Sequence, residues 1–187
     1  MASFQFHAHL NHLLLKILLL TFVTKPSFSV TPDDPTSQLI IKICDQTLDK
    51  QFCINVLQQN LPSPSTDAQT FAKISINQVL ANVTNTLSAV RQAKASASKE
   101  VADLLTICEE GYTVVSSSFN DALQALAIND SASVFLDEEQ SERPIKDCAN
   151  NINSVLPQFE KYNAQNLALQ KISAAAASIY FQQPPRS

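Results

Sequence analysis

Four cysteines are the residues of this sequence whose type and spacing most clearly predict chemistry: Cys44, Cys53, Cys108 and Cys148. An even number of cysteines in a secreted chain indicates disulfide bonds, and four cysteines can pair in three ways. We favour Cys44–Cys53, because these residues are close in sequence, and Cys108–Cys148, because both lie on the apolar sides of expected helices. A zinc site is the alternative, but the chain has no Cys-x-x-Cys pair and no histidine beyond its first 12 residues.

Other groups that could catalyse a reaction are scarce. The three histidines lie near the N-terminus, and Gly111 is the only glycine. A Ser-His-Asp or Cys-His site and a glycine-rich phosphate loop are therefore excluded for the rest of the chain. Glu109 and Glu110 are adjacent, so on a helix they point about 100° apart and do not form an acid–base pair. We expect no enzyme activity, no metal and no cofactor.

The acidic run Asp137, Glu138, Glu139 and Glu142 is the one cluster of like charge. It could be an acidic patch for a basic partner, a weak calcium site or a solvated loop, and we favour the loop. Removing Lys16 and Lys25 with the expected signal peptide leaves 11 basic and 17 acidic residues, a net charge of −6. This balance argues against nucleic acid and anionic membranes as partners.

The N-terminus predicts secretion. An apolar run from Leu13 to Val23 contains one charged residue, and Ser27-Phe28-Ser29 places small residues before a cleavage at Val30. The run is shorter than the about 20 residues that span a membrane, so we expect a signal peptide at residues 1–29, with a short uncleaved anchor as the alternative. The mature chain would comprise residues 30–187. Its sequons Asn82-Val83-Thr84 and Asn129-Asp130-Ser131 predict N-glycosylation at Asn82 and Asn129.

The elements that position these residues are predicted to be helices. From Val101 to Leu126, apolar residues recur in steps of four and three, the spacing that keeps one side of a helix in contact with partners. These are Val101, Leu105, Cys108, Tyr112, Val115, Phe119, Ala122 and Leu126. A second run with the same spacing comprises Ile145, Cys148, Ile152, Val155, Phe159 and Tyr162. Strands would require alternation, which is absent here.

The remaining patterns predict an all-α fold. Two short helices, at residues 36–45 and 50–60 and the first capped by Thr36 or Ser37, would form an N-terminal hairpin. Long helices at residues 67–98, 99–128, 132–157 and 164–181 would form an up-down-up-down four-helix bundle within residues 66–181. We expect the acidic run and Pro144 to interrupt the third long helix, and Pro157 to kink or end it.

Several motifs together resemble a known family, the plant invertase and pectin methylesterase inhibitors. The segment from Ile43 to Cys53, with eight residues between its cysteines, is similar to the hairpin signature of that family. Cys108 is followed by Tyr112 and by Asp121-Ala122-Leu123, Cys148 follows about 40 residues later, and Asn166 opens a closing helix of similar character. The resemblance covers residues 36–181.

The resemblance implies a four-helix bundle with a helical hairpin and the disulfide pairing favoured above. It also implies a non-enzymatic inhibitor, secreted to the apoplast or cell wall, that forms a one-to-one complex with pectin methylesterase or acid invertase and blocks its active-site cleft. The family contact surface on the second and third bundle helices corresponds here to exposed polar positions of the 99–128 helix. These are Glu110, Thr113, Ser117, Asn120 and Gln124.

Two motifs distinguish the target classes of the family, and both are missing. Cell-wall invertase inhibitors carry Pro-Lys-Phe after the second bundle helix, where this chain reads Asn129-Asp130-Ser131-Ala132-Ser133-Val134-Phe135. Pectin methylesterase inhibitors tend to carry Val-Ser-Ala-Ala before the fourth cysteine, where Val134-Phe135-Leu136-Asp137-Glu138 stands. We favour pectin methylesterase slightly over acid invertase. The alternatives are a helical signalling ligand, a structural wall protein, or a carrier of a small apolar ligand.

Overall fold

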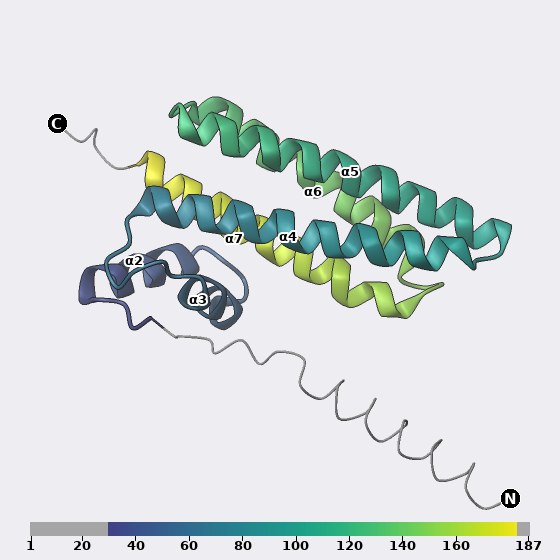
Figure 1. The fold of residues 1–187 in the computed structure, drawn as a ribbon, viewed down its shortest axis with the longest axis horizontal. Helices are drawn as coiled ribbons and strands as arrows, with labels where there is room; N and C mark the ends of the chain where they lie inside the picture. Colours follow the sequence, from purple (N-terminus) through teal and green to yellow (C-terminus); the bar gives the residue numbers. More distant parts are fainter. Residues whose placement is uncertain (1–29, 183–187) are drawn as a thin grey trace, which may run out of the picture.

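The described part of the chain, residues 30–182 of a computed structural model, is helical and contains no strand (Figure 1). Its elements are α2 (Asp34–Cys44), α3 (Lys50–Gln59), α4 (Ala68–Ala95), α5 (Lys99–Ala127), α6 (Ser131–Ile152), a 3-10 turn η1 (Pro157–Phe159) and α7 (Glu160–Phe181). The predicted signal peptide, residues 1–29, lies outside the described residues. The all-α prediction is confirmed.

Five helices begin at a side chain that accepts a hydrogen bond from a backbone N–H of the first turn, which is otherwise left without a partner. The capping residues are Asp33, Asp49, Asp67, Ser98 and Asp130. The prediction that Thr36 or Ser37 caps the first helix is wrong. The Asp33 carboxylate instead accepts from the Thr36 backbone at 2.8 Å, and Pro35 is tolerated because the first turn needs no N–H there.

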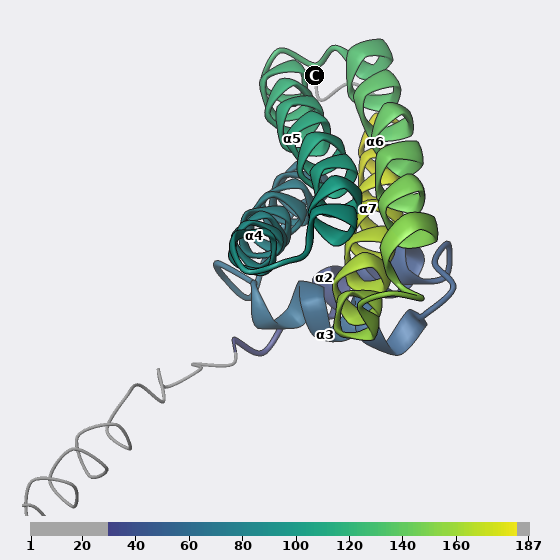
Figure 2. The ribbon, with the colours of Figure 1, turned by 90° about the vertical axis from the view of Figure 1, so that its right-hand side faces the viewer.

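The four long helices α4 to α7 run alternately in opposite directions, which confirms the up-down-up-down bundle (Figure 1). Viewed from one end of the bundle, α5 lies between α4 and α6, and α7 closes the arrangement (Figure 2). The favoured disulfide pairing is also confirmed: Cys44 is bonded to Cys53 and Cys108 to Cys148. The second bond ties α5 to α6 directly.

The hairpin of α2 and α3 packs on the side of the bundle formed by α4 and α7 (Figure 2). Ile40, Ile43 and Leu57 are buried there. The Thr66 backbone donates to the Thr36 hydroxyl at 3.0 Å and so ties the linker before α4 to α2. This position leaves the outward face of α5 uncovered.

Helix α6 is continuous where the sequence predicted an interruption. It runs without a break from Ser131 to Ile152, past the acidic run and Pro144, so the expected interruption and the solvated loop are wrong. The acidic run is tolerated because Glu138 turns inward onto Ser173 while Glu142 pairs with lysines. A proline removes one N–H from a helix and crowds the preceding turn. Here α6 packs its Pro144 against the bare backbone of Gly111 on α5.

The end of α6 also lies earlier than predicted. The helix stops at Ile152 rather than at Pro157, and α7 starts at Glu160 rather than at residue 164. Because the chain leaves the helix after Ile152, Val155 is 44% exposed and does not continue the buried apolar run that begins at Ile145. Pro157 instead opens the short turn η1, where its missing N–H costs nothing.

Replacing Gly111 with leucine is expected to destabilise the protein by about 1–3 kcal/mol, the usual effect of overpacking a close contact. A Cβ atom at residue 111 would lie 3.2 Å from the Pro144 carbonyl oxygen and 3.3 Å from its Cβ, so α5 and α6 would have to separate. Urea denaturation measures the change. Glu110→Leu, at the exposed neighbouring position, is the matched control and should change stability little. Equal stability of the two variants would contradict close α5–α6 packing at Gly111.

Candidate partner-binding face

The buried side of α5 is the one that the sequence predicts. Seven of its eight expected seam residues are buried, and Val101 near the start of the helix is partly buried. The buried residues are Leu105, Cys108, Tyr112, Val115, Phe119, Ala122 and Leu126. Because one side of the helix faces the core, the rotation of α5 is fixed, and so is the set of residues on its opposite side.

The five predicted partner-binding residues lie together on that opposite side and are all exposed. They are Glu110, Thr113, Ser117, Asn120 and Gln124, and we call them the α5 stripe. The Thr113 hydroxyl donates to the Glu109 carbonyl and the Asn120 amide to the Ser116 carbonyl, each at 2.7 Å. These bonds stay within α5. The stripe therefore presents polar groups that no other described element covers.

Two exposed apolar residues lie beside the stripe. Ile107 is 40% exposed and Val114 is 48% exposed, and the two lie about two turns apart along α5. Partner-binding surfaces commonly combine a few apolar anchors with surrounding polar groups that exclude water. Sequence reasoning missed these two residues, although their seven-residue spacing outside the seam was the available signal.

The stripe is held on a rigid support. The Cα atoms of Cys108 and Cys148 are 4.5 Å apart, and the Gly111–Pro144 contact lies next along the α5–α6 interface. On the other side of α5, Glu109 accepts from Arg91 at 2.8 Å and from Lys94 at 3.0 Å. A rigid surface loses little conformational entropy when it binds, which favours affinity.

A buried hydrogen-bond network connects α5 to α4 and α7. The Tyr112 hydroxyl donates to Asn163 Oδ1 at 2.6 Å, and Asn166 Nδ2 donates to the Tyr112 hydroxyl at 3.3 Å and to Thr86 Oγ1 at 2.9 Å. Asn163 in turn donates to Asn153, just after α6, at 2.6 Å. Burial raises the pKa of the Tyr112 phenol, so it stays a neutral donor. The network fixes how the helices are aligned along the bundle.

Tyr112→Phe is expected to lower the free energy of unfolding by about 1–2 kcal/mol, because the Asn163 oxygen loses a donor in a buried site. Urea denaturation with circular dichroism measures the loss. Tyr162→Phe is the matched control, since the Tyr162 hydroxyl forms no hydrogen bond within residues 30–182. The network would have no stabilising role if both variants unfolded at the same urea concentration.

The acidic residues do not assemble into a catalytic or metal site. Hydrogen bonds from Arg91 and Lys94 lower the pKa of Glu109, whereas Glu110 lies exposed on the stripe. Glu138 is buried against Ser173, while Glu139 points to solvent. Within the described residues, no three His, Cys, Asp or Glu side chains are placed to hold a metal ion.

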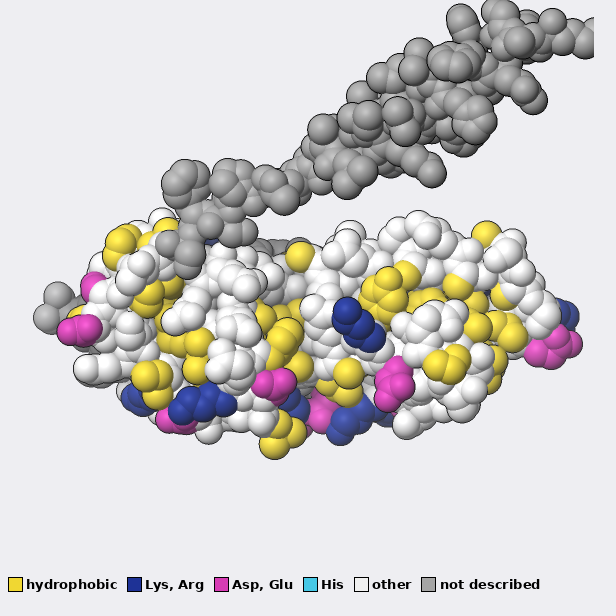
Figure 3. Space-filling model, turned by 90° about the horizontal axis from the view of Figure 1, so that it is seen from below, with side chains coloured by type: hydrophobic (Ala, Val, Ile, Leu, Met, Phe, Trp, Pro, Cys, Tyr) yellow, Lys and Arg dark blue, Asp and Glu magenta, His cyan; other side chains and the backbone are white. Residues whose placement is uncertain are grey.

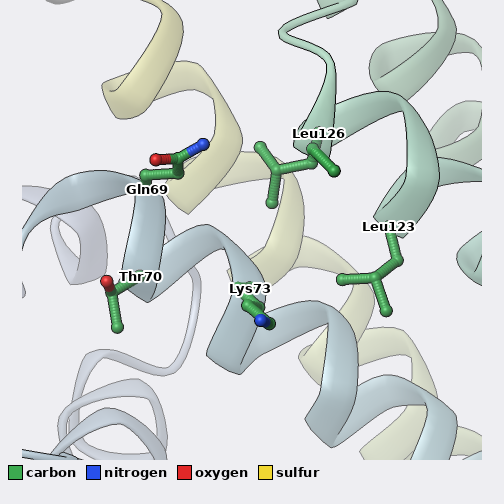
Figure 4. A pocket seen from close by; sticks show the side chains of 6 residues that line it. Gln69, Thr70, Lys73, Leu123 and Leu126 are labelled. Atoms are coloured by element: carbon green, nitrogen blue, oxygen red, sulfur yellow. The ribbon is translucent and has the colours of Figure 1, made fainter.

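Two surface grooves flank the helices. One, of about 480 Å³, lies between the start of α4 and the end of α5, with Lys73 and Leu123 on its walls (Figure 4). The other, of about 410 Å³, lies between the hairpin and α6–α7 and includes Phe52 and Leu167. A carrier of a small apolar ligand would need a lining of small residues, and the alanine run Ala174–Ala177 borders neither groove: three of its four alanines are buried in helix packing.

The two sequons differ in their surroundings. Asn82 lies in the middle of α4, and its side-chain nitrogen is buried with no hydrogen-bond partner in the part of the chain that the structure describes. Asn129 lies exposed in the turn between α5 and α6, with a φ of 59°. Asparagine tolerates this left-handed conformation better than most residues.

Charge is mixed on the face that carries the hairpin. Figure 3 shows Lys and Arg side chains interspersed with Asp and Glu along one edge, with uncharged and hydrophobic groups over most of the face. This face therefore lacks the continuous basic surface that nucleic acid binding requires. In the described part of the chain, no helix combines the length and the apolar character needed to cross a membrane.

Comparison with known proteins identifies relatives of this fold. A family model for the plant invertase/pectin methylesterase inhibitors matches residues 38–139, more than half of the chain, from the hairpin to the first part of α6. None of the curated proteins compared with the chain matches it.

Two solved structures are similar to the chain at low sequence identity. One is a mutant form of a pectin methylesterase inhibitor from Arabidopsis, with a TM-score of 0.65 and 19% identity over 73% of this chain and 93% of that one. Another is a pectin methylesterase inhibitor from Arabidopsis thaliana, with a TM-score of 0.58 and 18% identity over 81% of this chain and 99% of that one. At these identities the similarity establishes the shared fold.

Proposed function

Because the chain belongs to the plant invertase/pectin methylesterase inhibitor family, we propose that it is a protein inhibitor that binds a cell-wall enzyme through the α5 stripe. The observation that carries this proposal is the uncovered polar face of α5 on a disulfide-tied helix pair. Ile107 and Val114 supply apolar anchors beside it. The inhibitor acts by occupying the cleft of its target in a one-to-one complex, and it performs no chemistry itself.

Pectin methylesterase is the favoured target, and acid invertase is the second candidate. The two solved proteins described above are pectin methylesterase inhibitors of similar fold, which supports the first choice. The family also includes invertase inhibitors, so acid invertase remains the second candidate for the target. A helical signalling ligand or structural wall protein is the alternative if neither enzyme is bound.

The site of action is the apoplast or cell wall. The proposal rests on the signal peptide that the sequence predicts at residues 1–29 and on two disulfides, which persist in oxidising compartments such as the secretory route and the cell exterior. Residues 30–187 would then form the mature inhibitor.

Size-exclusion chromatography tests the choice of partner. Mature protein with both disulfides formed is mixed in turn with a plant pectin methylesterase and a plant acid invertase at pH about 5, within the window where the bundle is expected to be stable. We expect the esterase to elute earlier with one copy of the chain per enzyme. A complex with invertase alone would reassign the target, and no complex with either enzyme would contradict the inhibitor proposal.

A further inference from the structure

Three aromatic side chains gather at the end of the bundle where α6 begins and α7 ends. The ring centroids of Phe135 and Phe181 are 5.7 Å apart in an edge-on arrangement, and those of Tyr180 and Phe181 are 4.8 Å apart. Phe135 is 40% exposed, and the other two rings are partly exposed. Tyr180 and Phe181 pack partly against the core, so the three rings present their remaining apolar surface together at this end of the bundle. We call these three residues the aromatic cluster.

Asn129 lies directly beside this cluster. The Tyr180 hydroxyl donates a hydrogen bond to Asn129 Oδ1, which joins the turn before α6 to the last turn of α7. With Oδ1 held by Tyr180, the amide nitrogen Nδ2 is the free end of the exposed side chain. Nδ2 is also the atom to which an N-linked sugar is attached, and Asn129-Asp130-Ser131 has the required sequence.

We propose that Asn129 carries an N-linked glycan whose first sugar residue packs over the aromatic cluster, and that Asn82 remains unmodified. This deepens the proposed function, because it rests on passage of the chain through the secretory route. The group that covers the aromatic cluster would be an N-acetylglucosamine attached to Asn129.

The attachment follows ordinary glycosyl transfer. The Nδ2–C1 bond forms as the bond from C1 to a lipid-linked diphosphate breaks. The amide nitrogen loses one proton, and the lipid diphosphate leaves with the bonding electron pair. The donor is the lipid-linked oligosaccharide of the secretory pathway, so the inhibitor itself supplies only the acceptor nitrogen.

The chemistry of the sugar suits the surface next to it. One face of a pyranose ring presents C–H groups, and the faces of aromatic rings carry partial negative charge that attracts such groups. The cluster contains no charged side chain that would need to be desolvated. Tyr180 adds a hydroxyl at the point of attachment, which orients the amide and hence the first sugar.

The other sequon provides a contrast within the same chain. Asn82 Nδ2 is buried in the middle of α4, so a sugar there would have to displace the side chains that cover it. A chain modified at Asn82 would therefore not complete the bundle. The two sequons thus serve as a matched pair, one with an aromatic surface beside it and one without space.

The first test is the mass of the secreted protein. The full chain is expressed in plant cells, recovered from the medium and mapped by mass spectrometry, together with Ser131→Ala and Thr84→Ala. Each substitution removes one sequon and keeps its asparagine. We expect a glycan on Asn129 in the natural chain, none in Ser131→Ala, and no change in Thr84→Ala. An unmodified Asn129 in secreted protein would overturn the proposal.

The second test asks whether the glycan contacts the cluster. Removing it through Ser131→Ala should lower the melting temperature by about 2–4 °C, and by less than half of that in a Phe135→Ala background. If Ser131→Ala lowers the melting temperature equally in the natural chain and in Phe135→Ala, the glycan does not pack on the aromatic cluster.

Failure of secretion is distinguished from failure of the glycan proposal. If the natural chain is not found in the medium, the secretion part of the proposed function fails. Residues 30–187 behind an unrelated signal peptide then still report whether Asn129 is modified.

Discussion

Replacing Ser117 with arginine is expected to weaken inhibition of the target enzyme at least about 100-fold, or about 2.7 kcal/mol of binding free energy. Ser117 is the central residue of the α5 stripe, and its side chain is exposed. Interface centres are depleted in charge, and a long cationic side chain at this point would separate the two surfaces or bury an unpaired charge. The stability of the variant should be close to that of the natural protein, because the position contributes nothing to the core.

The measurement is residual enzyme activity at increasing inhibitor concentration, with thermal unfolding recorded for the same samples. Ser88→Arg introduces the same change on the exposed face of α4, outside the stripe, and should inhibit like the natural protein. If Ser117→Arg inhibits normally, the α5 stripe is not the contact surface, whatever the target proves to be.

The second large effect concerns a carboxylic acid inside the bundle. Glu138 on α6 is 2% exposed, and the Ser173 hydroxyl on α7 donates to its Oε1 at 2.5 Å, while its Oε2 has no hydrogen-bond partner among residues 30–182. Gln170 on α7 donates to the Glu138 backbone oxygen at 3.0 Å, and its own Oε1 is buried and likewise has no partner in the described part of the chain. Burial of a carboxylate oxygen that accepts no hydrogen bond favours the protonated, neutral form of Glu138.

Burial raises the pKa of Glu138 to about 7, and the neighbouring charge of Asp137 acts in the same direction. Lys171 is occupied by Glu142 at 2.5 Å and does not pair with Glu138. Because the folded pKa lies above the unfolded value of 4.5, the stabilising contribution is fully present below pH 4.5 and is lost as the pH rises towards 7. The loss amounts to about 3 kcal/mol.

Other carboxyl groups have the opposite effect at lower pH. Hydrogen bonds from lysine and arginine lower the pKa values of Glu109 and Glu142, so their contributions are lost as the pH falls below 4.5. Stability should therefore be greatest at about pH 4.5 to 5.

Glu138→Gln keeps the shape of the neutral acid and removes its titration. We expect this variant to be more stable than the natural protein by about 3 kcal/mol at pH 8 and nearly equal to it at pH 4. Urea denaturation across this pH range measures both curves. Glu139→Gln, at the exposed neighbouring residue, should keep the natural pH dependence. Parallel curves for the natural protein and Glu138→Gln would show that Glu138 is ionised without cost in the folded state.

Much of the architecture could be predicted because it depends on local patterns. The apolar residues from Leu105 to Leu126 recur at helical spacing, which determines the buried side of α5. The α5 stripe could therefore be predicted as the exposed residues on the opposite side. The disulfide pairing also followed from position, since Cys108 and Cys148 lie on facing apolar sides.

The errors concern contacts between segments distant in sequence. Pro144 was expected to interrupt a helix. The residue that accommodates it, Gly111, lies 33 positions earlier on another helix, and spacing along α6 does not reveal this contact. Glu138 looked like part of a solvated acidic run because the Ser173 that receives it is 35 residues away. The network around Tyr112 could not be predicted for the same reason, since the two asparagines that contact Tyr112 lie on α7. Spacing along one helix does not contain this information.

The central claim is that the chain inhibits its target by forming a tight one-to-one complex. Natural mature protein is titrated into a fixed amount of pectin methylesterase at about pH 5, and the remaining activity is followed. We predict a linear loss of activity that ends at one inhibitor per enzyme. Full activity at a large excess of folded protein, with acid invertase equally unaffected, would contradict the account.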